Sequence, residues 1–415
     1  MSTRRRLLRI ALGSTAGAAL APWAALSVAA GTSTTSTTSH TANRFVFIIL
    51  RGGLDGLTAV PALGDPAFAD ARGALGVFAS EPLRLDATFA LNPLLPRLHA
   101  MYGSGELAVL HAVGLPYRER SHFDAQQVLE SGGTRPHELT TGWLGRALGS
   151  AGGTGGTLRA VALETAVPLV LRGPAEVDTW APSTLPGPGA DLVARLELLY
   201  RNDPALAQAL ARARSLRADP GMAANVQGMP AGGSGGAGGG GRSAAIALAR
   251  KAAEFLQRGS QVAVMELGGW DSHTAQASPV GATSNNLRTL DATLDALREG
   301  LQPAGTWGRT VVLVATEFGR EVAVNGNQGT DHGTGSAAFV VGGAVKGGRV
   351  LADWPGLAKK DRFEGRDLRI TTDLRAAIRP ILAEHLQVPH AALDGVVLPG
   401  SANVVSLDLL RRSAA

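Results

Sequence analysis

The chain has 415 residues, 45% of them hydrophobic, and a formal net charge of +5. This length suits one large domain or two small ones, with the hydrophobic share of an ordinary globular protein. Cysteine is absent, which excludes disulfides, iron–sulfur clusters, a thiol nucleophile and a lipid-modified cysteine anchor. Any metal must therefore be held by oxygen and imidazole ligands. No Lys/Arg-rich block follows the N-terminus, which argues against a nucleic-acid partner.

The N-terminal segment is predicted to be an export signal. Thr3-Arg4-Arg5-Arg6-Leu7-Leu8-Arg9 fits a twin-arginine motif, and a Gly/Ala-rich apolar run from Ile10 to Ala30 follows it. Such a run favours a removed signal peptide (residues 1–30) over a membrane anchor, and the Ser/Thr-rich residues 31–43 form a flexible leader. We expect export of the folded protein by the twin-arginine translocase to the periplasm or the medium, with no stable membrane anchor after cleavage.

From Arg44 onward, short apolar runs alternate with longer helical patterns. The predicted strands are 45–50, 107–113, 158–163, 262–267, 310–315 and 337–341. The predicted helices are 123–131, 190–200, 204–217, 243–258, 284–300 and 374–386. Because the strand runs are continuously apolar, they predict an α/β fold with a mainly parallel sheet sandwiched between helices.

The domain organisation follows from where the strands lie. The Gly-rich run 232–241 is either a domain boundary or a mobile surface loop. We favour the loop, since strands of one sheet are predicted on both sides of it. Residues 44–410 are then a single domain, with a helical insertion at 170–240.

Five polar clusters follow predicted strands or come just before one. In an open α/β sheet, ligands bind at the carboxyl ends of the strands. Carboxylates and imidazoles gathered there from distant parts of a chain are typical of a metal site. The clusters are 51–56 (RGGLDG), 120–124 (RSHFD), 268–273 (GGWDSH), 316–320 (TEFGR) and 329–333 (GTDHG).

Three of these clusters carry candidate metal ligands. Asp271 and His273 are two residues apart after a strand, so in an extended segment they point the same way. His332 is a further imidazole ligand, and Asp331 either binds the metal or orients an imidazole. Glu317 ends a buried strand, where a carboxylate needs a partner: either a metal or Arg320.

Two clusters are ambiguous by themselves. Asp55 lies in a Gly-rich turn, and alone it is typical of an Asx-turn or a helix N-cap. Ser121 precedes a predicted helix, and with Asp124 it resembles a capping box. The same position suits a nucleophile whose anionic centre the helix end and Arg120 would stabilise. A metal-free Ser-His-Asp esterase is a third option, although no Gly-x-Ser-x-Gly elbow surrounds Ser121.

Together, the motifs resemble a bacterial family known as domain of unknown function 1501 (DUF1501). The resemblance rests on LRGGLDG at 50–56, RSHF at 120–123, GWDSH at 269–273, TEFGR at 316–320, GTDHG at 329–333 and TTDLR at 371–375. That family in turn resembles the alkaline phosphatase and sulfatase superfamily. The resemblance implies one metal held by Asp55 and Glu317 beside the nucleophile Ser121, and a second held by Asp271, His273 and His332.

Two departures from the superfamily pattern are visible. Glu317-Phe318 stands where its Asp-His pair is expected, which removes one imidazole and makes a one-metal site an alternative. The Cys-x-Pro-x-Arg signature is absent, so a formylglycine sulfatase is not expected.

The resulting expectation is an exported metal-dependent hydrolase of small anionic esters, either phosphate or related oxyanion esters. It would use one or two divalent ions (Zn, Mn, Mg or Ca) and catalytic Ser121 and Arg120. Arg51, His122 and Arg320 would contact the substrate. The alternative is a non-catalytic periplasmic binding or assembly protein on a degenerate hydrolase scaffold.

Overall fold

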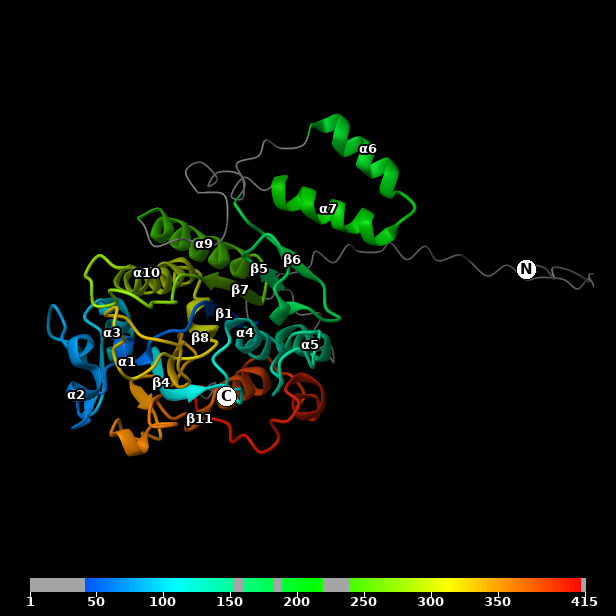
Figure 1. Cartoon of the computed structure of the whole chain (residues 1–415). Helices are drawn as coiled ribbons and strands as arrows, with labels where there is room; N and C mark the ends of the chain where they lie inside the picture. Colours follow the sequence, from blue (N-terminus) through cyan, green and yellow to red (C-terminus); the bar gives the residue numbers. More distant parts are fainter. Residues whose placement is uncertain (1–41, 152–159, 183–188, 219–238, 412–415) are drawn as a thin grey trace, which may run out of the picture. The chain divides into compact units, whose positions relative to one another are not determined.

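A nine-stranded sheet forms the centre of the described part of the chain (Figure 1). The computed structural model describes residues 42–151, 160–182, 189–218 and 239–411. The strand order is β10-β4-β9-β8-β1-β7-β5-β6, and β11 pairs with β4. The strands are β1 Arg44–Leu50, β4 Leu107–Gly114, β5 Ala160–Ala162, β6 Val177–Thr179, β7 Val262–Leu267, β8 Thr310–Thr316, β9 Ser336–Val341, β10 Arg349–Leu351 and β11 Thr372–Asp373. A separate antiparallel pair joins β2 (Leu83–Arg84) and β3 (Ala90–Leu91).

The direction of β9 determines which loops meet. β1 runs parallel to both β7 and β8, whereas β9 runs antiparallel to both β8 and β4. The carboxyl ends of β1, β4, β7 and β8 therefore lie along one edge of the sheet, and β9 begins at that same edge. Loops that are far apart in the sequence meet there.

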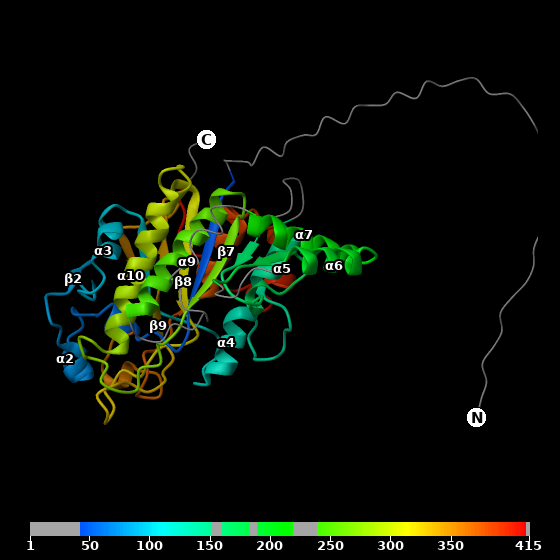
Figure 2. The same ribbon diagram turned by 90° about the horizontal axis from the view of Figure 1, so that it is seen from above.

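Helices cover both faces of the sheet, because alternate residues of a strand point to opposite sides. Val46, Ile48 and Leu50 of β1 belong to a core shared with α9 and α10, whereas Phe45, Phe47 and Ile49 belong to a core shared with α4 and α5. Figure 2 shows α9 and α10 on one side of β8, β1 and β7, with α4 and α5 on the other. The mainly parallel α/β sandwich is confirmed.

The helices have the following bounds. The α-helices are α1 Gly56–Ala59, α2 Phe68–Arg72, α3 Pro96–Gly103, α4 His122–Ser131, α5 Trp143–Ser150, α6 Ala190–Tyr200, α7 Pro204–Ala218, α9 Gly239–Gln257, α10 Ala282–Leu301, α11 Arg375–Pro380 and α12 His390–Ala392. Short 3-10 turns are η1 Gly73–Gly76, η2 Leu169–Leu171, η3 Trp307–Arg309 and η4 Lys359–Asp361, and π-helical turns are η5 Ile381–His385 and η6 Leu393–Val397.

The predicted strands and helices are present within a few residues of their expected ends. The sequence prediction lacked α3, α5 and the short strands, which carry too few residues for a clear periodic pattern. Among the described residues, no helix combines the length and apolarity needed to cross a membrane. The predicted signal peptide, most of the leader and most of the Gly-rich run lie outside the described residues.

Candidate metal centre

Four segments bring the candidate metal ligands to one edge of the sheet. Asp271 and His273 follow β7, and His332 lies in the loop that leads into β9. His122 is the first residue of α4, which follows β4. Glu317 and Arg320 follow β8. These positions follow from the strand directions, since β4, β7 and β8 end at the edge where β9 begins.

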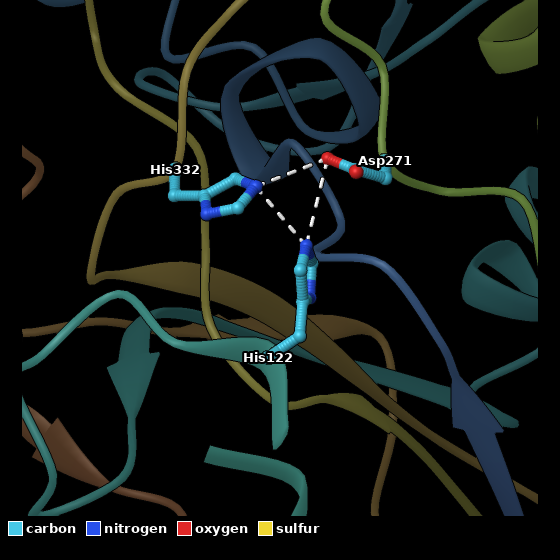
Figure 3. A group of neighbouring side chains, drawn as sticks. All are labelled: His122, Asp271 and His332. Atoms are coloured by element: carbon cyan, nitrogen blue, oxygen red, sulfur yellow. Dashed lines mark hydrogen bonds and ion pairs between the residues drawn. The ribbon is translucent and has the colours of Figure 1, made fainter. Parts of the chain in front are cut away.

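Three side chains converge closely. His122, Asp271 and His332 each offer one ligand atom, and these atoms all lie within 4.8 Å of one another. Nε2 of His122 is 3.0 Å from Nε2 of His332, and Oδ1 of Asp271 is 3.2 Å from the latter and 3.6 Å from the former. Figure 3 shows the three groups pointing toward one another from three separate segments.

His273 adds a fourth donor beside Asp271 and His332. Its Nε2 lies 2.9 Å from Oδ1 of Asp271 and 3.1 Å from Nε2 of His332. Donor atoms around one tetrahedral zinc ion, at bond lengths of about 2.0–2.1 Å, lie roughly 3.3 Å apart. The spacings of Asp271 and His332 from each other and from the other two donors, 2.9 to 3.6 Å, are of that size, while His273 lies outside the group of three whose atoms are all within 4.8 Å of one another.

The opposite nitrogen of each imidazole contacts an oxygen that can only accept. Nδ1 of His122 is 2.8 Å from Oε1 of Glu317, and Nδ1 of His273 is 3.1 Å from Oδ1 of Asp331. Nδ1 of His332 is 2.9 Å from the carbonyl oxygen of Arg120. Each Nδ1 must therefore carry the proton, and in the neutral ring Nε2 is a bare lone pair.

The lone pairs make the donor set fit a cation. Neighbouring Nε2 lone pairs and a carboxylate oxygen about 3 Å apart would repel one another unless a positive charge, either a proton on one ring or a bound cation, lay between them. Imidazoles whose other nitrogen donates to a carboxylate or carbonyl are the usual arrangement in metal sites. The residues present therefore fit a divalent metal ion.

Glycines let the loops approach closely. Gly52 has φ of +116°, and a Cβ there would lie 2.4 Å from the backbone nitrogen of Asp271. A Cβ on Gly329 would lie 2.2 Å from the backbone carbon of His273. Only glycine fits at such positions, so these residues of the sequence motifs bring the donor loops together.

Phe318 supports two of the imidazoles. Its ring centroid lies 4.6 Å from that of His122 and 5.1 Å from that of His332. Phe318 is itself buried. Phe318 therefore packs against two of the donor rings.

Ion pairs keep the two carboxylates ionised. Burial raises the pKa of Asp271, but the hydrogen bond and the charge of Arg320, together with His273 and His122, lower it overall. Burial likewise raises the pKa of Glu317, while contacts with His122, Gln126 and the backbone of Gly52 lower it overall. A negative charge is therefore retained on both groups.

The imidazoles of His122 and His332 differ in basicity. The hydrogen bond to Glu317 raises the pKa of His122, whereas burial lowers the pKa of His332. The pKa of Asp331 is lowered first by its hydrogen bond from Asn325 and then by His273. Asp331 thus lies behind His273, and its Oδ1 atom faces Nδ1 of that ring.

The structure places Asp55 away from this donor set. It is the N-cap of α1, and its side chain accepts from the backbone nitrogens of Leu57 and Thr58. It also forms a buried ion pair with Arg72. Glu317 lies behind His122, through its contact with Nδ1. Neither carboxylate contacts the Nε2 donors in the described structure.

The predicted anion-binding arginines are already paired. Arg51 forms ion pairs with Glu130 and Glu266. Arg120 forms ion pairs with Glu364 and Asp367. Arg320, 2% exposed, binds the carboxylate of Asp271, so the Glu317–Arg320 pair, one of the two alternatives for Glu317, is not formed.

Ser121 lies beside the donors in the chain. It is the N-cap residue of α4, but its hydroxyl makes no capping hydrogen bond. Asp124 instead accepts from the hydroxyl of Tyr117 and contacts His137. The capping box is therefore not formed, and the Ser121 hydroxyl is not engaged with the first turn of the helix.

Sequence reasoning did not assign His122 to the metal. The sequence signal that could have identified His122 is its position between a predicted strand and a predicted helix, which places it at the same edge of the sheet as the other clusters. Gln126 and Asn325, which hydrogen-bond Glu317 and Asp331, were also missed. Such polar residues gave no signal, because their role depends on tertiary contacts.

Comparison with known proteins gives a family and a set of distant structural likenesses. A family model described as "Protein of unknown function (DUF1501)" matches residues 99–389, a range that contains His122, Asp271, His273 and His332. No curated protein matches the chain.

Several solved structures resemble the chain. A sulfatase from Pseudoalteromonas sp., PsFucS1, is 13% identical, with 88% of this chain and 71% of the sulfatase covered and a TM-score of 0.42. The phosphonate monoester hydrolase of Agrobacterium radiobacter is 11% identical, with 84% and 74% covered and a TM-score of 0.41. A protein in the alkaline phosphatase superfamily from Vibrio parahaemolyticus is 11% identical, with 74% and 61% covered and a TM-score of 0.38. Scores of this size do not extend the likeness to ligands or reactions.

Proposed function

Because the chain belongs to the DUF1501 family, whose function is unknown, we propose a function from the site itself: a metal-dependent hydrolase of phosphate or related oxyanion esters. The observation that carries this proposal is that the Nε2 atoms of His122, His273 and His332 lie 3.6, 2.9 and 3.2 Å from Oδ1 of Asp271. Each of these imidazoles is fixed from behind by an acceptor.

The residues that would hold the ion also favour a particular metal. His122, Asp271 and His332 would be its ligands, with His273 as a fourth. Three imidazoles suit zinc better than magnesium or calcium, which prefer oxygen ligands. When bound, a divalent ion would supply Lewis-acid polarisation of an oxyanion oxygen.

Ser121 is the proposed nucleophile. Its Oγ would form a bond to the phosphorus while the P–O bond to the alcohol breaks, the hydroxyl proton would leave with the alcohol, and water would then hydrolyse the phosphoryl-serine to phosphate and free serine. Its position at the N-terminus of α4 supports this role, since unpaired backbone N–H groups there favour negative charge. Its hydroxyl contacts the Tyr117 hydroxyl, and burial raises the pKa of Tyr117 to about 12, so Tyr117 stays protonated.

One observation favours a second candidate, a metal-binding protein without catalysis. Arg51 and Arg120 were expected to hold the substrate anion, yet each is paired with two carboxylates. An anion would have to compete with those carboxylates for the guanidinium groups. A binding or assembly role requires no such exchange.

Elemental analysis and a substrate panel separate the two candidates. The hydrolase predicts stoichiometric metal, hydrolysis of at least one phosphate, phosphonate or sulfate ester, and loss of that activity in Ser121→Ala and Asp271→Ala. Metal-loaded protein that hydrolyses no ester of a broad panel supports the binding role. Metal-free protein of undiminished thermal stability contradicts the metal centre itself, because a tightly bound ion stabilises the native state.

We further propose that the chain is exported by the twin-arginine translocase, from the motif at residues 3–9. Replacing Arg4 and Arg5 together by lysine keeps the charge and should retain the protein inside the cell. Arg9→Lys is the matched control and should be exported normally. Normal export of the double variant, measured by cell fractionation, would refute this route.

A further inference from the structure

A buried chain of hydrogen bonds connects Asp55 to the metal-ligand candidate Asp271. Nε2 of Gln276 donates to Oδ2 of Asp55, and Oε1 of Gln276 accepts from the Thr330 hydroxyl at 2.8 Å. Nε of Arg320 donates to that hydroxyl at 3.2 Å, and Nη1 of Arg320 donates to Oδ1 of Asp271 at 2.6 Å. We call Asp55, Gln276, Thr330 and Arg320 the relay.

Each member of the relay has a single possible orientation. The Asp55 carboxylate only accepts, so the amide nitrogen of Gln276 must face it and the amide oxygen must face Thr330. The Thr330 hydroxyl then donates to Gln276 and is left to accept from Arg320. Because all four residues are at most 4% exposed, no water can substitute for a lost partner without cost.

The Asp55 end of the relay is firmly anchored. Oδ2 of Asp55 accepts from Arg72, Thr58 and Gln276, and Oδ1 accepts from two backbone nitrogens. A carboxylate offers about four lone-pair positions, so none remains for a metal ion. The buried guanidinium of Arg72 supplies the positive charge at Asp55, and the residue does not fit the metal role that the family resemblance gave it.

The Asp271 carboxylate at the other end needs such support. The Asp271 side chain is 44% exposed and lies on a loop, so its carboxylate would be free to rotate without Arg320. A metal ligand that rotates loses affinity, because its orientation must be fixed again on binding. Arg320 itself is held on its other nitrogens by Thr330 through the hydroxyl and the carbonyl oxygen.

We propose that the relay is a positioning device that fixes the Asp271 carboxylate for metal binding, with Asp55, Gln276 and Thr330 as positioning residues that touch neither metal nor substrate. This inference rests on the proposed metal centre. It extends the site inward from the edge of the sheet, and it assigns Asp55 a mechanical role in place of a ligand role.

The test uses the full chain and Co²⁺ alone as the probe, with the affinity and the visible d–d absorption spectrum as readouts. Thr330→Val removes the hydroxyl and keeps the side-chain shape, and Thr330→Ser restores the hydroxyl. Thr293→Val is the control, because Thr293 is fully buried in α10 and its hydroxyl bonds only its own helix in the described structure. Gln276→Met breaks the relay one step closer to Asp55, should Thr330→Val fail to fold.

We expect Thr330→Val and Gln276→Met to lower the Co²⁺ affinity by about tenfold or more and to change the d–d bands, while Thr330→Ser and Thr293→Val match the wild type. Wild-type binding that neither variant alters in affinity or spectrum overturns the relay and leaves the metal centre standing. A wild-type chain that binds no Co²⁺ overturns the metal centre, and the relay's role with it.

Discussion

Nδ1 of His122 lies 2.8 Å from Oε1 of Glu317, a carboxylate that is 1% exposed. This contact holds the proton on Nδ1 and leaves Nε2 free toward Asp271 and His332. Glu317 also accepts from the backbone nitrogen of Gly52 and from Gln126. The carboxylate thus fixes an imidazole, a glycine turn and a helix together.

We therefore expect Glu317→Gln to weaken zinc binding by about tenfold, since an amide oxygen is a weaker acceptor for the imidazole N–H than a carboxylate. Competition titration against a chelator would measure this. Glu106→Gln is the control, because Glu106 is a half-buried carboxylate that accepts from Arg298 and Trp307 but lies away from the donors in the fold. Equal affinities in both variants would contradict the role of Glu317.

A second prediction concerns the buried pair of Asp55 and Arg72. Asp55→Asn leaves the guanidinium buried without its counter-charge, which should lower the free energy of unfolding at neutral pH by about 3 kcal/mol. Urea denaturation would measure the loss. The double variant Asp55→Asn with Arg72→Met removes both charges and should recover part of it. Additive losses in this double-mutant cycle would show that the two residues are not coupled.

The raised pKa of Glu164 should make the free energy of unfolding depend on pH. Burial, and then the charge of Glu266, raise the pKa of Glu164 to about 8 from an ordinary 4.5. The folded state therefore binds this proton more tightly than the unfolded chain, and stability falls as the pH rises from about 4.5 to about 8. Above that window the full cost of the buried charge is present.

Glu164→Gln should remove this cost. We expect its Tm to exceed that of the wild type by about 2 °C at pH 8.5, allowing for solvent screening of a partly exposed group, with no gain near pH 4. Thermal unfolding over this pH range would measure the difference. A Tm difference that stays constant with pH would contradict the assignment.

The glycine at position 52 should tolerate no side chain. Gly52→Ala places a Cβ against the backbone of Asp271 at a strongly positive φ, so we expect a loss of at least about 2 kcal/mol in unfolding free energy. Gly103→Ala is the matched control, since a Cβ there meets nothing within 4 Å at the end of α3. Comparable stability of the two variants would show that the loops can separate without cost.

The sequence predicted which candidate ligands meet at one edge of the sheet, and it did so for a physical reason. Continuous apolar runs identify strands buried on both faces, and parallel strands end at one edge. That reasoning placed Asp271, His273 and His332 in the same region before any contact was known. Strand positions can be predicted because they depend on the local apolar pattern, and the shared edge can be predicted because it follows from the rules of strand connection.

The pairing of individual side chains was not predictable in the same way. Glu317 was expected to bind a metal or Arg320, whereas it contacts His122, and Arg320 contacts Asp271. Arg72 stands in a short helix without any distinguishing pattern, yet it neutralises Asp55. These pairings depend on how the loops pack against one another, and that packing depends on close glycine contacts such as the contact of Gly52 with Asp271.

The reversal of β9 has a consequence for how the site is inherited. Because β9 starts where β8 ends, residues 317–335 leave the sheet and return to it at the same edge, in one excursion. That excursion carries the donor His332, the carboxylate of Glu317 that fixes His122, and the guanidinium of Arg320 that holds Asp271, so these three functions are encoded in one contiguous stretch. An exchange of this stretch between relatives would replace all three residues at once. The site would then form only if the new residues fit His122, Asp271 and His273.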